Sequence, residues 1–161
     1  MSTLQSKKVV VAEVSEIAKA AHSLVLSEYR GLTVAQITQL RKSAREQNVD
    51  VRVVKNTLAK RALADTTFEC VVDHLVGPLI LAFSMNEDDP SAAARVVNNF
   101  VKDKANEKLV VTKLVFEGEV HDASSLNAIA TLPTKDEAIS MLLAVLKAPV
   151  QKLAATLQSV K

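Results

Sequence analysis

The strongest constraint on the fold is a stripe of apolar residues near the end of the chain, with no later segment of the printed sequence to cover it. Its members are spaced mostly three or four residues apart, as in a helix that buries a narrow apolar line against another helix. The stripe comprises Ile139, Leu142, Leu143, Leu146, Val150, Leu153, Leu157 and Val160. It can pack back onto the rest of the chain or dock partner helices, and the pattern alone leaves both open.

Pro149 lies in the middle of this stripe. Proline lacks a backbone N–H and its ring clashes with the preceding helical turn, so we expect a kink or two helical segments there. Thr134 and Glu137 have the spacing of a capping box, which starts a helix just after Pro133. We therefore predict an α+β domain over residues 1–133 and a protruding C-terminal helix, kinked near Pro149, over residues 134–161.

The part before Pro133 alternates between strand-like and helix-like segments. Apolar residues make up 48% of the chain and aromatic residues only 3%, so a core of Val, Leu, Ile and Ala is expected. Thr33 and the Asp89-Pro90 pair are suitable helix starts. Strands are predicted over residues 23–29, 49–53, 79–83 and 109–116. The prediction is a single two-layer domain with a four-stranded mixed sheet and helices mainly on one face, although alternation alone also permits an α/β sheet.

Positive charge is concentrated between Arg41 and Arg61. This stretch holds seven basic and two acidic residues, a net charge of +5, whereas the whole chain carries +2. Such a local concentration is typical of an anion-binding surface. Asn56 or Thr57, at the junction of a strand and a helix, should cap that helix, and Lys60 and Arg61 should follow on its first turns, where free N–H groups attract phosphate. The alternative is an ordinary solvated helix face.

The turn after the first predicted strand has suitable chemistry for a nucleic acid. Tyr29 can stack on a base or sugar, and Gly31 lets the backbone approach a ligand closely.

Candidate catalytic and metal-binding groups are scattered. His22, His74 and His121 lie far apart and lack partners at metal-ligand spacing, and the three glycines form no phosphate-binding loop. We therefore predict no enzyme, cofactor, metal site or small-molecule substrate. A single cysteine, Cys70, predicts a reducing compartment, and its apolar neighbours predict a buried thiol. We also expect no membrane-spanning segment and no signal peptide, which favours the cytoplasm.

Eight short segments, in order along the chain, carry a resemblance to a known family. They are Val11–Ser15, Arg30–Thr33, Arg52–Leu58, Phe68–Cys70, Val76–Pro78, Ala92–Arg95, Phe116–Glu119 and Thr131–Thr134. Together they cover the chain nearly end to end, and the chain resembles the bacterial form of large-subunit ribosomal protein ten, the stalk-base family.

The resemblance implies a domain bound to large-subunit rRNA at the base of the ribosomal stalk, beside the neighbouring ribosomal protein there. The implied RNA contacts fall on the turn after the first strand and on the segment around the start of the following short helix. They are Tyr29, Arg30, Gly31, Leu32, Thr33, Arg52, Lys55, Asn56, Thr57, Lys60 and Arg61.

In this family the C-terminal helix carries dimers of an acidic stalk protein, which recruit translation factors. Members with longer helices carry more dimers, so the short helix here, divided at Pro149, implies two dimers docked between Ile139 and Val160. The resemblance thus implies a structural constituent of the large subunit. The residues by themselves also allow a free-standing RNA- or DNA-binding module that dimerises through its C-terminal helix, or a small α/β enzyme.

Overall fold

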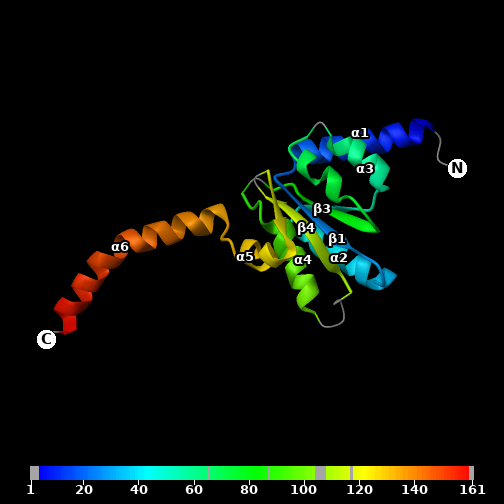
Figure 1. Ribbon diagram of the computed structural model, residues 1–161. Helices are drawn as coiled ribbons and strands as arrows, with labels where there is room; N and C mark the ends of the chain where they lie inside the picture. Colours follow the sequence, from blue (N-terminus) through cyan, green and yellow to red (C-terminus); the bar gives the residue numbers. More distant parts are fainter. Residues whose placement is uncertain (1–3, 65, 87, 104–107, 117, 160–161) are drawn as a thin grey trace.

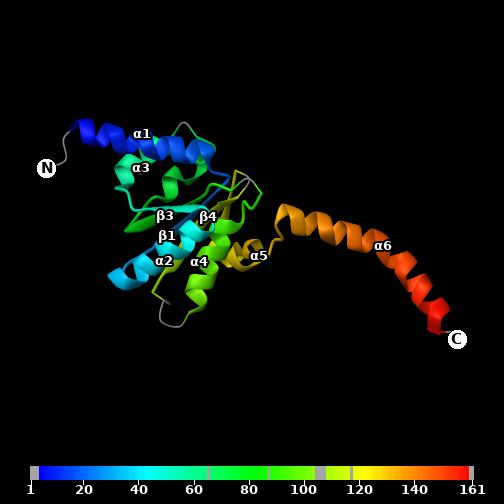
Figure 2. The same cartoon turned by 180° about the vertical axis from the view of Figure 1, so that it is seen from behind.

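A computed structural model describes residues 4–64, 66–86, 88–103, 108–116 and 118–159. A single sheet with helices on both faces forms the body of the molecule, and a long helix leads away from it to the C-terminus (Figure 1 and Figure 2). The predicted α+β class with a C-terminal helix is confirmed. The predicted sheet and its covering differ in three respects.

First, the sheet is antiparallel and not mixed. Its strands are β1 (Ser23–Glu28), β2 (Val49–Arg52), β3 (Leu79–Ser84), β4 (Val110–Phe116) and β5 (Glu119–Asp122). The order is β2-β3-β1-β4-β5, and every neighbouring pair is antiparallel. The strands joined by a helix, β1 with β2 and β3 with β4, run in the same direction, but in each case another strand lies between them. The parallel pairs of a mixed sheet therefore do not form.

Second, the sheet has five strands and not four. The additional strand, β5, is only four residues long and lies at an edge, where none of its residues is fully buried. It therefore has neither the apolar run nor the alternation that marks a strand in a sequence. Gly118, just before β5, has a φ of 85°, which favours glycine in a tight connection between β4 and β5.

Third, the sheet is covered on both faces, so the domain has three layers. One face packs against α1 (Leu4–Ala20), α3 (Asn56–Leu63) and the 3-10 segment η1 (Glu69–His74). The other packs against α2 (Val34–Glu46), α4 (Ala92–Lys102) and α5 (Leu126–Ala130), which follows the 3-10 turn η3 (Ala123–Ser125). Figure 1 shows α1 and α3 on the opposite side of the sheet from α2 and α4.

The strands themselves explain the two-sided covering. In β1, Leu24 and Leu26 face the α1–α3 side and Val25 faces the α2–α4 side, and all three are buried. A strand that is buried on both faces has a continuous apolar run in its sequence. Such a run does not distinguish a sheet covered by helices on one face from a sheet covered on both. The two-layer prediction was wrong for this reason.

The predictions of helix starts were correct at α2 and wrong at α4. Thr33 caps α2 in a capping box with Gln36, as expected from its residue type. The α4 start was misplaced: the helix begins at Ala92, and the buried Asp89 instead accepts hydrogen bonds from the Ser91 hydroxyl and the Arg95 guanidinium.

The thiol of Cys70 is exposed, so its predicted burial was wrong.

The C-terminal helix α6 spans Lys135–Ser159. The capping box predicted at its start is present, because Thr134 N donates to Glu137 Oε2 at 3.0 Å and Glu137 N donates to Thr134 Oγ1 at 3.4 Å. The helix continues through Pro149 without an assigned break. A kink at Pro149 therefore stays a prediction.

Candidate nucleic-acid interface

The ends of β1 and β2 and the beginnings of β3 and β4 meet at one end of the sheet, because neighbouring strands are antiparallel. Glu28 pairs with both Leu79 and Val110, and Arg52 pairs with Leu81. The turn after β1 and the β2–α3 junction, which are distant in sequence, are thereby placed at the same end of the domain.

A hollow of about 440 Å³, here called the end-of-sheet hollow, lies at this end. Four of the predicted RNA contacts line it, although they come from two separate segments. They are Tyr29, Lys55, Asn56 and Thr57, and the other lining residues are Val53, Val54, Gly77, Pro78 and Leu79. The predicted residues at the β1 turn and at the α3 start are therefore neighbours in space.

The start of α3 differs from the prediction. Neither Asn56 nor Thr57 caps this helix: Lys55 occupies the N-cap position, and no side chain caps it. The Asn56 side chain instead donates from Nδ2 to the carbonyl of Gly77 at 2.9 Å. The first turn of α3 thus faces the hollow without a side-chain cap, and the positive end of the helix dipole favours an anion there.

The turn after β1 combines structural and exposed residues. Leu32 and Tyr29 are half-buried and pack against the α2–α4 side of the core. Thr33 accepts a hydrogen bond from Gln36 N at 3.4 Å as the cap of α2. Arg30 is exposed. Leu32 and Thr33 therefore have roles in packing and capping that explain their residue types. Within the described part of the chain, no such structural role is seen for Arg30, which stays available for RNA.

Lys108 lies beside this turn, and no local pattern in the sequence predicts its position. Gly31 has a φ of 90°, and a Cβ added there would lie 3.2 Å from Lys108 Cδ. The Lys108 side chain therefore lies against the Gly31 backbone and adds a cation to the turn. It is far away in the chain, and only the pairing of β1 with β4 brings it to this place.

Lys60 and Arg61 lie away from the α3 start, contrary to expectation. Because α3 has only eight residues, both fall in its last turn. Arg61 lines a separate hollow of about 570 Å³ together with Lys7 and Lys8 of α1. The predicted basic helix start therefore contains Lys55 but not these two residues.

Arg52, the last residue of β2, belongs to a third hollow of about 390 Å³. Its Nε donates to Asp50 Oδ2 at 3.1 Å, and both side chains of the pair are partly exposed. Exposed ion pairs contribute little to stability, so this pair orients the guanidinium without being needed for folding.

The predicted partner-binding residues lie on α6, apart from the sheet. Their exposed fractions run from 50% for Ile139 and Leu143 to 70% for Val150 and Leu157. Neither core cluster contains a described residue of α6. The alternative in which the stripe completes the domain core is therefore wrong. Val160, the last predicted contact, lies outside the described residues.

The composition of α6 also bears on membranes. A stretch of 18 residues within Lys135–Gln158 has a mean hydropathy of 1.4 and none of it is buried in the domain, so by length and composition the helix could cross a membrane. The expectation that no segment is long and apolar enough was therefore wrong. However, Lys147 and Lys152 lie within this segment, and a lysine at the bilayer centre costs roughly 2.5–3.5 kcal/mol. Burial of both lysines in a bilayer is therefore unfavourable.

Comparison with known families decides the affiliation. Residues 2–102 match the family model described as "Ribosomal protein L10", and residues 132–161 match "Ribosomal protein uL10 C-terminal region". The chain belongs to the ribosomal protein L10 family.

Curated relatives in this L10 family align with nearly all of the chain. The relative in Methylococcus capsulatus is 54% identical over 92% of this chain and 83% of its own length. Those in Halorhodospira halophila and Dichelobacter nodosus are each 52% identical over 98% of this chain, and 88% and 94% of their own lengths are covered. All three are named large ribosomal subunit protein uL10. The resemblance and the prediction that the chain is not an enzyme are confirmed.

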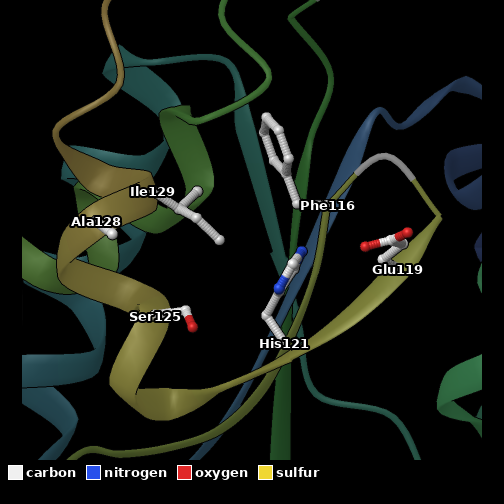
Figure 3. Close-up of a pocket in the computed structure, with 6 residues that line it drawn as sticks. All are labelled: Phe116, Glu119, His121, Ser125, Ala128 and Ile129. Atoms are coloured by element: carbon white, nitrogen blue, oxygen red, sulfur yellow. The ribbon is translucent and has the colours of Figure 1, made fainter.

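One further hollow of the L10-family domain contains groups that could suggest catalysis. It has a volume of about 480 Å³, and in Figure 3 Ser125 and Ile129 face Phe116 and His121 across it. Ala128 and Glu119 complete its lining. Among the residues that the structure describes, no group of three or more His, Cys, Asp or Glu could hold a metal ion. This hollow gives no support to the enzyme alternative.

The carboxylate of Asp122, at the end of β5, has a lowered pKa. The cause is Lys113 on β4, which donates a hydrogen bond to this carboxylate and places a positive charge beside it. The pair is solvent-exposed on the Asp122 side and joins the two strands of the hairpin, so its role is structural.

Proposed function

We propose that this chain is a structural constituent of the large ribosomal subunit, that its domain binds large-subunit rRNA at the stalk base, and that α6 carries dimers of the acidic stalk protein, which recruit translation factors. The observation that carries the proposal is the alignment of relatives named for that subunit with up to 98% of this chain. With this role we also propose a cytoplasmic location and the neighbouring stalk-base protein as a partner.

The end-of-sheet hollow supports the RNA-binding part. Lys55 and the uncapped first turn of α3 offer positive charge to phosphate, and Arg30 and Lys108 extend it across the β1 turn. The half-buried Tyr29 supplies an aromatic ring that is held in place by the core and can stack on a base. This is the combination of cations and a fixed aromatic that single-stranded or looped RNA needs.

The exposed stripe of α6 supports the docking part. Apolar patches that remain exposed in a folded chain mark interaction surfaces. After the first turn of α6 the charged residues are Lys147 and Lys152, both positive, which complements an acidic partner. Two docking positions, one before and one after Pro149, correspond to the two dimers that we propose.

A free-standing nucleic-acid-binding module is the second candidate, and no observation on the fold favours it. The two candidate functions predict different locations of the protein after sedimentation at high salt. A subunit constituent should co-sediment with large ribosomal subunits at high salt, whereas a free-standing module should dissociate from them.

The RNA interface is tested by replacing Arg30, Lys55 and Lys108, the three cations at the end-of-sheet hollow and the β1 turn, with alanine. We expect weaker binding to a stalk-base rRNA fragment and a flatter dependence on salt, because each lost phosphate contact removes roughly 0.7–0.9 from the slope of log affinity against log salt. The measurement is fluorescence anisotropy over a range of salt concentrations with the full chain.

A matched control carries Lys19→Ala, Lys102→Ala and Lys147→Ala, which changes the net charge equally at positions away from the three hollows. This control should keep nearly the same affinity for the rRNA fragment and the same salt slope as the parent chain. If the two triple variants lose the same affinity and slope, the charge is nonspecific and the assigned interface is wrong.

A further inference from the structure

Two arginines of α2 lie outside the proposed interface. Arg41 and Arg45 are exposed and one helical turn apart, and with Arg52 of β2 they line the hollow of about 390 Å³, here called the arginine hollow. The remaining lining residues are Val49, Asp50, Val51 and Val53. Three guanidinium groups from a helix and a strand thus surround one hollow that contains a single carboxylate.

The arginine hollow adjoins the end-of-sheet hollow. Val53, directly after β2, lines both of them. β2 is an edge strand, with α2 on one face of the sheet and α3 on the other. Arg41 and Arg45 of α2 and Lys55 at the start of α3 therefore line two adjoining hollows, although the two helices belong to opposite layers.

The side-chain chemistry of this hollow favours phosphate. All its cations are arginines, whose planar guanidinium groups bind phosphate oxygens through two parallel hydrogen bonds, whereas lysine acts as a point charge. Asp50 accepts from Arg52 Nε at 3.1 Å and 3.3 Å, which holds that guanidinium by one side. With three positive charges and one negative charge, the hollow keeps a surplus of positive charge.

A simpler explanation is that charges on an edge strand prevent pairing with other chains. That explanation requires charges on β2 only, whereas Arg41 and Arg45 come from α2 and converge on the same hollow. The opposite edge strand, β5, begins with Glu119 and ends with Asp122. Protection of edges therefore does not account for a cluster with a surplus of positive charge that includes two residues of α2.

We propose that the arginine hollow is a second phosphate-binding site for RNA, so that the bound RNA continues from the end-of-sheet hollow around the β2 edge onto α2. This inference rests on the proposed rRNA-binding function and extends it to a surface outside the predicted contacts, apart from Arg52. Contacts to the RNA backbone position the nucleic acid and add affinity, but they do not read its sequence.

The test is the double variant Arg41→Gln and Arg45→Gln in the full chain. Both side chains are exposed, so the fold should be retained, which a thermal unfolding curve checks. For binding to the stalk-base rRNA fragment, we expect the salt slope to fall by roughly 1.4–1.8, at 0.7–0.9 for each of two lost contacts. The charge-matched control is Lys19→Gln with Lys102→Gln, and its slope should stay at the parent value.

A second variant, Arg41→Lys with Arg45→Lys, separates charge from hydrogen-bond geometry. This variant should keep the salt slope of the parent while its affinity for the RNA falls. Lysine keeps the positive charge, but it cannot donate the two parallel hydrogen bonds of a guanidinium group. An affinity equal to that of the parent would overturn the arginine-specific site.

The other outcomes separate this inference from the function on which it rests. If the glutamine variant matches its control while the Arg30, Lys55 and Lys108 variant binds weakly, the arginine hollow is not an RNA site and the proposed function stands. If the glutamine variant binds RNA normally but is lost from salt-washed large subunits, the hollow contacts a protein, and the inference is again wrong. Absence of RNA binding by the parent chain would overturn both.

Discussion

The domain and α6 use the same kinds of apolar residue for opposite purposes. Leu24 and Leu26 of β1 are fully buried, whereas Leu146 and Leu153 of α6 are 65% and 63% exposed. Composition does not distinguish the two regions. The difference is that the strands are enclosed by helices on both faces, while α6 leads away from every other element (Figure 1). An apolar stripe that adds nothing to the core is available for a partner.

The two regions are joined by a few polar contacts at the base of α6. Arg95 of α4 pairs with the buried Asp89 at 2.6 Å and also donates to the carbonyl of Leu132 at 3.0 Å. Lys135 N donates to the carbonyl of Asp88 at 3.2 Å. Beyond this base the described side chains of α6 are exposed, apart from the half-buried Ala148. The domain should therefore fold without the helix.

The largest expected effect comes from removing α6. A chain that ends at Thr134 should keep the thermal unfolding midpoint and the RNA affinity of the parent, because the core clusters contain no described residue of the helix. It should lose the acidic partner completely in a pull-down assay. If this shortened chain instead aggregates or unfolds without cooperativity, α6 belongs to the core, and the contrast between a self-contained domain and a separate helix is wrong.

The next prediction applies one substitution to both regions. Leu26→Ala, in the buried centre of β1, should lower the free energy of unfolding by about 2–5 kcal/mol. Leu146→Ala, on α6, should change it by less than about 0.5 kcal/mol, because the side chain is already exposed. Chemical denaturation of the two variants measures both values. Equal losses of stability would mean that α6 packs on the domain in solution.

The smallest expected effect tests whether α6 holds two separate docking positions. Leu142, Leu143 and Leu146 lie before Pro149, and Leu153 and Leu157 lie after it. Replacing Leu153 and Leu157 with alanine should remove one dimer of the acidic partner and leave the other. Native mass spectrometry of the complex counts the dimers directly.

The matched control for that experiment is Leu142→Ala with Leu146→Ala, which should also remove one dimer. Loss of both dimers from either variant would indicate one cooperative site. An unchanged mass for the Leu153 and Leu157 variant would show that the distal stripe is not an interface. All four side chains are at least 60% exposed, so unfolding does not explain a loss of partner.

Much of the local structure was accessible from the sequence. The caps at Thr33 and Thr134, the alternation in β2 and the helical stripe of α6 all depend on side chains a few residues apart, which interact in the same way in most contexts. β5 was missed because a short, exposed edge strand has no such signature. The site residues are predicted partly from charge, residue type and periodicity and partly from the resemblance, and their roles stay predictions.

What the sequence by itself determined is therefore most of the local elements, the family, and the presence of an apolar stripe near the C-terminus. Only the tertiary structure decided which elements meet. Insertion of β3 between β1 and β2 makes the sheet antiparallel, pairing of β1 with β4 places Lys108 against Gly31, and the α2–β2 packing gathers Arg41 with Arg52. The physical reason is that strand pairing is selected by the burial of both sheet faces at once, a property of the whole chain that no local pattern contains.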